Sequence, residues 1–336
     1  MPWRYVWDLS RAFGRLRKQE PVTGIHLQFE HFAFGAGALG IANAFAVLFV
    51  CAWQRITKGT KVVITTHGVL SPSILTPEFI REQGGGLPPL VLKSVFGLTY
   101  KMISWASNYI VVHSAGLKAR LETEWRGIRR DVYVIPIMLY GYDAGKDILI
   151  PEIRERQTEG KKVILTLGFL ARYKGLETLI DEFPAEGDCD YHCIIAGSSP
   201  KRLDKDESYQ AWRSELKRQV DANRNVSLVE DYIPDEALPS WYIEADIVVI
   251  PYQYMLASSG PLVWALATRS NLLVSTAFEG MIDSCLIYQR GALLERSVSC
   301  GTAEHQAAVE REAKQRVPEK VVSQLLVVYD KALLLK

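Results

Sequence analysis

Short apolar runs rich in β-branched residues alternate along this chain with segments of helical periodicity, and this alternation restricts its fold most. In residues 176–183, for example, Leu176, Leu179, Ile180 and Phe183 recur at the spacing of one helix face. Strands that alternate with helices form βαβ units with parallel strands. The predicted strands are 24–28, 62–66, 109–113, 132–135, 162–167, 192–196, 226–228, 247–250 and 272–275, and the predicted helices include 10–18, 176–183, 208–222, 261–267 and 321–335. The sequence therefore predicts an α/β protein with parallel sheets.

A break near residues 141–160 separates two sets of predicted strands. Gly141, Gly145 and Pro151 fall in this stretch, and a charged run over 152–162 follows. A chain of 336 residues is long enough for two domains of ordinary size. We therefore expect two doubly wound, Rossmann-like domains over 1–150 and 151–315. The helix over 316–336 is expected to pack back toward the first domain.

Two segments of the second half place positive charge or backbone N–H groups where an anion can bind. The first, VILTLGFLARYKG at 163–175, is a strand run and a glycine turn, followed by Arg172 and Lys174 at the mouth of a helix. The second, SSGPL at 258–262, is a turn of small residues that opens another helix. Open parallel sheets bind ligands beyond the carboxyl ends of their strands, where both segments lie. Without a nucleotide-hydrolase motif, two such segments indicate the diphosphate of a nucleotide-sugar.

The composition argues against several other kinds of partner. Because 39 basic and 38 acidic residues leave a formal net charge of +1, charge gives no reason to expect nucleic acid. Five cysteines without paired spacing fit neither a zinc site nor a disulfide framework, and no cluster has metal-ligand spacing. We therefore expect a cytoplasmic protein without a metal. The basic clusters at 11–18 and 126–130 are read as solvated helix faces or as contacts with anionic lipid at the inner membrane face.

The segment 32–53 carries no charge and is long enough to span a bilayer. However, Gly35, Gly37, Gly40 and Asn43 dilute its apolar character, and a predicted strand follows it closely. A helix buried between a sheet and another layer is apolar all round for the same reason as a membrane helix. We therefore expect a buried core helix, and a membrane span or a helix lying in the membrane surface remain the alternatives.

Seven blocks, read in order, resemble the retaining GT-B glycosyltransferases of family 4, also described as glycosyl transferases group 1. The blocks are TTHGVL (65–70), NYIVVHSAGLKARL (108–121), VYVIP (132–136), LGFLARYKGLETLIDEF (167–183), HCIIAGSSP (192–200), VEDYIPDEALPSWYIEADIVVIPY (229–252) and SSGPLVWALA (258–267). The resemblance covers most of residues 24–280 and implies two Rossmann-like domains that face a cleft. It also implies transfer of a hexose from an NDP-sugar to a hydroxyl of a glycan, lipid-linked or small-molecule acceptor, with retention and without a metal.

The resemblance also implies roles for individual residues. It implies donor binding by Gly168, Arg172, Lys174, Ile233, Ser258, Ser259, Gly260, Pro261 and Glu279, and catalytic roles for His67, Arg172 and Lys174. In this scheme Arg172 and Lys174 neutralise the diphosphate, and His67 lies against the donor sugar. Ile233 stands where the backbone holds the nucleoside base. Gln28 and His31 follow the first strand and could face the cleft, whereas His113 is expected to serve the fold.

Some positions depart from the family pattern and keep a second function open. Leu256 and Trp264 stand where the family commonly carries two glutamates. The family's opening strand and glycine-rich loop have no counterpart in the sequence, so we expect an incomplete first domain. The alternative is therefore a non-catalytic or split subunit that keeps the fold, with a partner chain that supplies the remaining segment.

Overall fold

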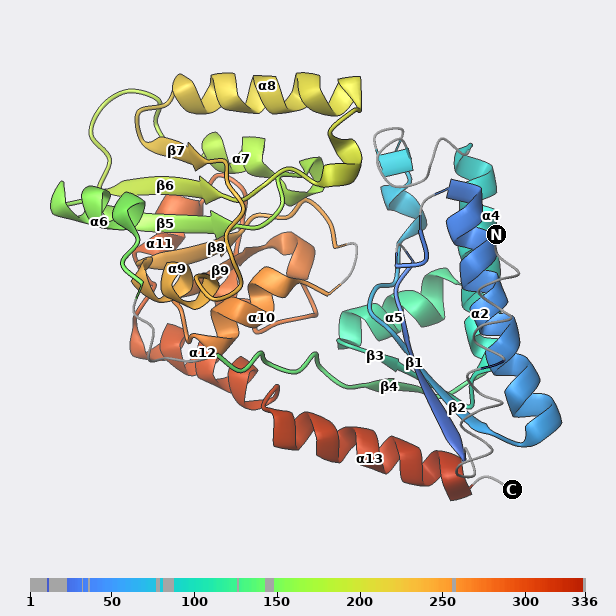
Figure 1. The fold of residues 1–336 in the computed structure, drawn as a ribbon. Coiled ribbons are helices and arrows are strands. Elements are labelled where there is room, and N and C mark those ends of the chain that lie inside the picture. Colours follow the sequence, from blue (N-terminus) through green and yellow to red (C-terminus); the bar gives the residue numbers. More distant parts are fainter. Residues whose placement is uncertain are drawn as a thin grey trace. The chain divides into compact units, whose positions relative to one another are not determined.

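The computed structural model describes residues 11, 23–31, 33–35, 37–76, 79–80, 88–125, 127–142, 148–255 and 258–334 (Figure 1). The predicted helix 10–18, apart from Arg11, lies outside the described residues, as do Arg126 and Leu256. The chain forms two compact units, residues 1–137 with 256–258 and 319–336, and residues 138–255 with 259–318.

The first unit is built on four parallel strands. Their order across the sheet is the order in the chain, β1 (Gly24–Phe29), β2 (Lys61–Thr66), β3 (Tyr109–Val112) and β4 (Val132–Val134). Most residues of β2 and β3 are buried, as expected for strands covered on both faces. The parallel sheet expected from the alternating pattern is therefore confirmed in this unit.

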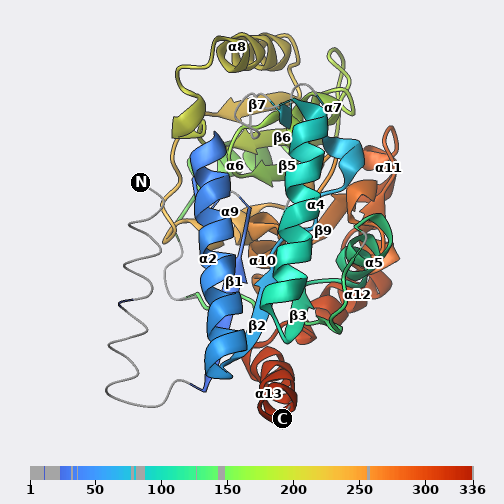
Figure 2. The same cartoon turned by 90° about the vertical axis from the view of Figure 1, so that its right-hand side faces the viewer.

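Helices cover both faces of this sheet. On one face, Val63 and Val111 pack against Val328 and Ala332 of α13 (Pro318–Leu334). The other face carries α2 (Gly37–Lys58) and α4 (Pro89–Ala106), which lie side by side in Figure 2. The helix α5 (Ala115–Glu124) follows β3, and the Ser114 side chain caps it by accepting the Leu117 N–H at 3.1 Å. The short 3₁₀ helix η1 spans Pro72–Ile74.

The second unit is built on six parallel strands whose order is that of a dinucleotide-binding fold. The strands are β5 (Lys162–Leu167), β6 (Tyr191–Ala196), β7 (Val226–Val229), β8 (Ile247–Ile250), β9 (Leu272–Ser275) and β10 (Ile287–Tyr288). Across the sheet they run β7, β6, β5, β8, β9, β10, which is the 3-2-1-4-5-6 order of the Rossmann fold. The sequence predicted five of these strands and missed β10, which has only two residues.

Helices lie on both faces of the six-stranded sheet. One core contains α7 (Leu176–Ile180), α8 (Glu207–Asp221) and Leu293 of α11 (Leu293–Ser297), packed on Ile164 and Ile195. The helices α9 (Leu238–Glu244), α10 (Gly260–Ala267) and α12 (Ala303–Lys314) pack with one another and cover the other face (Figure 1). The remaining elements are α6 (Pro151–Thr158) and the 3₁₀ turns η2 (Arg172–Lys174), η3 (Lys201–Leu203), η4 (Thr276–Phe278) and η5 (Ser284–Leu286).

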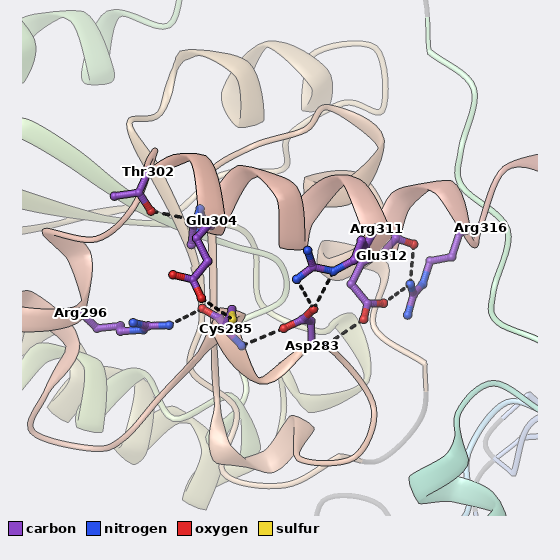
Figure 3. A network of polar contacts seen from close by, with 9 residues as sticks. Asp283, Cys285, Arg296, Thr302, Glu304, Arg311, Glu312 and Arg316 are labelled. Carbon is purple, nitrogen blue, oxygen red and sulfur yellow. Dashed lines mark hydrogen bonds and ion pairs between the residues drawn. The ribbon is translucent and has the colours of Figure 1, made fainter.

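A network of hydrogen bonds and ion pairs connects α12 to the turn at η5 (Figure 3). The Asp283 carboxylate accepts the Cys285 N–H at 3.0 Å and an Arg311 N–H at 2.7 Å. The Asp283 N–H donates to Glu312 at 2.8 Å, and Glu312 pairs with the buried Arg316. Because each charged group has a partner, these groups fix the turn against the helix instead of destabilising it.

The expectation of a fully buried helix over 32–53 is only partly right. The helix begins at Gly37 and ends at Lys58, and its buried side includes Val47, Leu48 and Cys51. Its other side leaves Phe49, Trp53 and others more than half exposed. Among the described helices, α2 alone is long and apolar enough to span a membrane, and 44% of its most apolar window is buried. The uniform apolar composition therefore reflects one buried face and one exposed face.

Candidate active site

The loops that carry the two anion-binding segments follow β5 and β8, which are neighbours in the sheet of the second unit. In the 3-2-1-4-5-6 order, these are the strands at which the chain reverses its direction across the sheet. Connections leave this switch point toward opposite sides and open a crevice at the carboxyl ends of the strands. The topology thus puts 168–174 and 251–260 at the position where such sheets bind ligands.

Glycines allow the backbones at this edge to approach closely. Gly168 has φ +135°, and a Cβ atom on it would lie 2.3 Å from Lys174 Nζ and 3.5 Å from Pro261 Cγ. Gly197, with φ +147°, follows β6, and its Cβ would lie 2.0 Å from the carbonyl oxygen of Gly168. Only glycine tolerates such positions. Gly168 therefore lies between Lys174 and Pro261, and the structure brings both segments together there.

Lys174 is a buried cation at this switch point. Only 7% of the residue is exposed, and burial lowers the pKa of its ammonium group from 10.5 to about 8. Its Nζ lies 5.6 Å from the centre of the Tyr252 ring. Within the described part of the chain, no carboxylate forms an ion pair with it. A buried charge is costly unless it is paired, so this position favours an incoming anion.

Arg172 is turned toward α8. One guanidinium N–H group donates to the Ser208 carbonyl oxygen at 2.6 Å and to its hydroxyl at 3.1 Å. The guanidinium carbon lies 5.5 Å from the centre of the Trp212 ring. The structure therefore places Arg172 and Lys174 in one short 3₁₀ turn but with different partners.

The segment at 258–262 opens α10, as the sequence predicts. Ser259 is the N-cap, and its buried hydroxyl accepts the Leu262 N–H at 3.2 Å. Pro261 has no N–H, and the space beside Gly260 is open. Ser258 groups with the first unit, and its N–H donates to the His67 carbonyl oxygen at 2.8 Å. The helix start therefore offers Gly260 as the residue that an anion can approach most closely.

The other predicted donor-binding residues follow different strands of the same sheet. Ile233 is half-buried in the loop after β7, and Glu279 is exposed after η4, which follows β9. Trp264 lies on α10, and its ring centre is 5.0 Å from that of Tyr140. Asp235 and Glu236 line the same pocket as these two rings. Where the family commonly has a glutamate, this chain thus has an aromatic pair next to two carboxylates.

In the first unit, His67 belongs to a chain of side-chain hydrogen bonds that the sequence did not predict. His67 Nδ1 lies 3.1 Å from His113 Nε2, and His113 Nδ1 lies 2.9 Å from the Ile135 carbonyl oxygen. On its other side, His67 Nε2 lies 2.9 Å from Gln28 Oε1. The chain continues from Gln28 to His26 at 3.2 Å and from His26 to the Tyr329 hydroxyl of α13. His113, expected to serve only the fold, therefore contacts the predicted catalytic histidine directly.

Burial favours the neutral form of these histidines. It lowers the pKa of His67, whereas the charge of Glu30 acts weakly in the opposite direction. Burial also lowers the pKa of His26, and His67 adds to this effect. His31 packs edge-on against Phe96 and Tyr100, and removal from water lowers its pKa to about 3. We therefore interpret His31 as a neutral histidine of the hydrophobic layer, and Gln28 as a partner of His67.

Two further residues contribute to the site geometry, although the sequence predicted no individual role for them. The Tyr252 ring faces the Lys174 ammonium group, and the Ser259 hydroxyl donates a hydrogen bond to the Tyr252 hydroxyl at 3.4 Å. Gly197 permits the close approach of the chain after β6 to the chain after β5. The sequence carried a signal for both, because Pro251 and Tyr252 directly follow β8 and Gly197 directly follows β6 at the same sheet edge. No three His, Cys, Asp or Glu residues gather as metal ligands in the part of the chain that is described.

Comparisons with known proteins show similarity to glycosyltransferases. Residues 150–294 match the family model for glycosyl transferases group 1. The mannosylfructose-phosphate synthase of Agrobacterium fabrum is 27% identical over 172 residues, which cover 47% of this chain and 36% of that protein. The chain thus spans about a third of the length of this relative.

Solved structures share the fold at low sequence identity. Sucrose-phosphate synthase from Thermosynechococcus elongatus has a TM-score of 0.66 at 14% identity over 96% of this chain and 76% of that one. A trehalose-phosphate synthase from Burkholderia xenovorans, solved with glucose-6-phosphate, has a TM-score of 0.66 at 12% identity, and the match covers 98% of this chain and 76% of that one. HepE from Anabaena, solved with UDP, has a TM-score of 0.62 at 16% identity, and the match covers 86% of this chain and 76% of that one. The chain therefore shares the α/β fold of these GT-B glycosyltransferases, and residues 150–294 are similar to glycosyl transferases group 1.

Proposed function

We propose that this chain is a glycosyltransferase that moves a hexose from a nucleoside-diphosphate sugar to a hydroxyl acceptor, with retention of configuration. The observation that carries the proposal is the Lys174 ammonium group, buried at the switch point next to Gly168 and the start of α10. A departing diphosphate gains negative charge in the transition state, so a fixed cation stabilises it more there than in the ground state.

The remaining roles follow from the same chemistry. The N-terminus of α10 adds a favourable dipole at Gly260, and Arg172 supplies a second cation from the same 3₁₀ turn as Lys174. These groups offset the diphosphate charge, so we propose transfer without a bound metal. We propose that His67 contacts the transferred sugar, as the resemblance implies. Ile233 and Glu279 are proposed to contact the donor at the base and the sugar.

The donor and acceptor to test first are suggested by the structural neighbours. HepE was solved with UDP and with UDP-glucose, and the Burkholderia enzyme with glucose-6-phosphate. We therefore propose a UDP-sugar donor and a sugar or sugar phosphate as the first acceptor class. All five cysteines are free, which supports a cytoplasmic location.

The test is calorimetric titration of the purified chain with UDP-glucose, GDP-mannose and ADP-glucose, followed by a transfer assay with radiolabelled donor. The double variant Arg172→Ala/Lys174→Ala is expected to lose donor binding. The matched control is Lys217→Ala/Arg224→Ala, which removes two exposed cations near the amino end of β7, away from the site. Saturable binding without transfer to any acceptor would favour the non-catalytic subunit. No binding of any donor by the folded chain would overturn the proposal.

A further inference from the structure

The two helices on one face of the first sheet leave a large apolar surface uncovered by the described residues. On α2 the side chains Phe49, Trp53 and Ile56 form a stripe, and each is more than half exposed. On α4, Val91, Leu98 and Trp105 recur every seven residues and are 45–49% exposed. A monomeric protein in water rarely exposes a contiguous apolar patch of this kind without a function.

The two stripes form one surface. Both helices precede neighbouring parallel strands, so they run in the same direction across the sheet (Figure 2). The Phe49 and Trp105 rings lie with centres 6.5 Å apart, and Arg55 donates to the Trp105 carbonyl oxygen at 2.9 Å. The carboxyl ends of α2 and α4 are therefore adjacent, and a tryptophan from each helix lies there. We call this surface the α2–α4 face.

The charged residues of the two helices all have one sign. Neither helix contains an aspartate or a glutamate, whereas Arg55 and Lys58 belong to α2 and Lys93 and Lys101 to α4. A further cation joins them, because Arg130 Nε donates to the Ser104 carbonyl oxygen near the end of α4 at 3.1 Å. The chain as a whole has a net charge of only +1, so this concentration of cations is local.

We propose that the α2–α4 face binds the surface of an anionic lipid bilayer, with both helices lying in the plane of the membrane. Tryptophan prefers the boundary between headgroups and acyl chains, and Trp53 and Trp105 would sit at that depth. Arginine and lysine side chains reach from an apolar surface to lipid phosphates, so cations near the membrane strengthen the attachment.

Other occupants fit this surface less well. A symmetric dimer through this face would bring cations from both copies together, which costs energy when no acidic residue on either helix compensates. A membrane span by α2 would require the buried side, including Leu48 and Cys51, to leave the core of the sheet. The lipid surface alone satisfies the apolar stripes and the cations without unfolding the unit.

Vesicle flotation with the full chain tests the proposal. The chain is expected to float with vesicles of 70% phosphatidylcholine and 30% phosphatidylglycerol, and its partition coefficient should fall at least tenfold in 0.5 M NaCl or with phosphatidylcholine alone. Binding should also shift tryptophan fluorescence to the blue. Phe49→Ser/Trp53→Ser and Lys58→Glu/Lys101→Glu should each reduce partitioning at least tenfold, with circular dichroism confirming that both variants remain folded.

A control double variant distinguishes binding through this face from non-specific hydrophobic adsorption. Ile243→Ser/Val298→Ser removes two exposed apolar side chains of the second unit, and its partitioning should equal that of the unchanged chain. Equal flotation of all variants, or no flotation of the folded chain with anionic vesicles, would overturn the proposal. So would a concentration-dependent dimer that Phe49→Ser/Trp53→Ser abolishes, or resistance of the bound chain to carbonate extraction.

Discussion

His67 and His113 share a hydrogen bond in which His67 Nδ1 lies 3.1 Å from His113 Nε2. The direction of this bond follows from the partner behind it. The Ile135 carbonyl oxygen can only accept, so His113 Nδ1 carries a hydrogen and, in the neutral ring, its Nε2 must accept from His67. His67 then has a lone pair at Nε2, which requires the Gln28 amide to turn its N–H₂ group toward it. His113 is therefore a positioning residue for His67.

Two substitutions at His113 separate its two contacts. Glutamine places its amide near the position of Nε2 and can keep the contact with His67, whereas asparagine reaches only the position of Nδ1. We expect His113→Asn to lower kcat about tenfold with little change in donor KM, and His113→Gln to keep most of the rate. Steady-state kinetics with both variants checks this. Equal rates for the two variants would mean that His113 serves the fold alone.

We expect the Lys174 charge to lower the stability of the empty protein and to promote binding of the donor. Its pKa falls from 10.5 to about 8 on burial, so the charged form destabilises the empty protein at pH 7 by roughly 3 kcal/mol, at 1.36 kcal/mol for each pH unit. Lys174→Met keeps the length of the side chain without the charge. It should raise the melting temperature of the empty protein and abolish donor binding. A destabilised Lys174→Met variant would show that the ammonium group already has a partner.

The affinity for a nucleoside diphosphate should depend on pH through the same group. In the proposed site the diphosphate pairs with protonated Lys174, which is the dominant form below a pKa of about 8 and is lost above it. Calorimetric titration with UDP-glucose, whose diphosphate does not titrate in this range, should therefore give a constant affinity at pH 6–7 and a decrease approaching tenfold for each unit above pH 8. In Lys174→Arg, whose guanidinium stays charged, this decrease should disappear.

Much of the fold could be predicted because its signals are local. The boundaries of β5, β8 and β9 agree with the apolar runs in the sequence, since strands buried on both faces are apolar along their length. The strand β10 was not predicted, because the two residues Ile287 and Tyr288 are too short an apolar run to indicate a strand. The exposure of one side of α2 was not predicted either, since an apolar composition does not indicate which face of a helix is covered.

The histidine chain could not be predicted for a different reason. His26, His67 and His113 follow or belong to three different strands, and only the parallel register of β1 with β2 and of β2 with β3 aligns them. Tyr329 is 303 residues away from His26 in the chain. By contrast, Gly168 and Lys174 lie within one motif, so the local sequence already indicated where they would meet.

Gly197→Ala tests the close approach of β6 and β5. The new Cβ would lie 2.0 Å from the Gly168 carbonyl oxygen, and the backbone has φ +147°. Since the obstacle is backbone, the loop that precedes Lys174 must move, and we expect donor affinity to fall at least tenfold. The control is Gly187→Ala, where φ is +88° but no atom lies within 4 Å of the added Cβ. It should cost about 1 kcal/mol of stability and leave donor affinity unchanged. Equal affinities in both variants would contradict a tight contact at Gly168.

Asp283 should make the second unit more stable above the pKa of its carboxyl group than below it. Hydrogen bonds from Arg311 and from the Cys285 N–H hold this pKa below the ordinary value of 3.8 (Figure 3). A carboxyl group whose pKa is lowered on folding stabilises the protein above its unfolded pKa, and this contribution is lost as the pH falls through the folded value. Asp283→Asn should therefore cost about 1–2 kcal/mol at pH 7, and the difference should shrink below pH 4.

Thermal melts at several pH values check this, with Asp188→Asn as the control. Asp188 is an exposed carboxylate of the same unit, and its substitution should leave the stability curve unchanged. A double-mutant cycle with Arg311→Gln should give a coupling energy of about 1 kcal/mol at pH 7 that decreases as the pH falls through the lowered pKa of Asp283. Since Arg311 stays charged throughout, we expect the loss of coupling at low pH from protonation of Asp283. A coupling energy that does not depend on pH would instead point to packing of the two side chains.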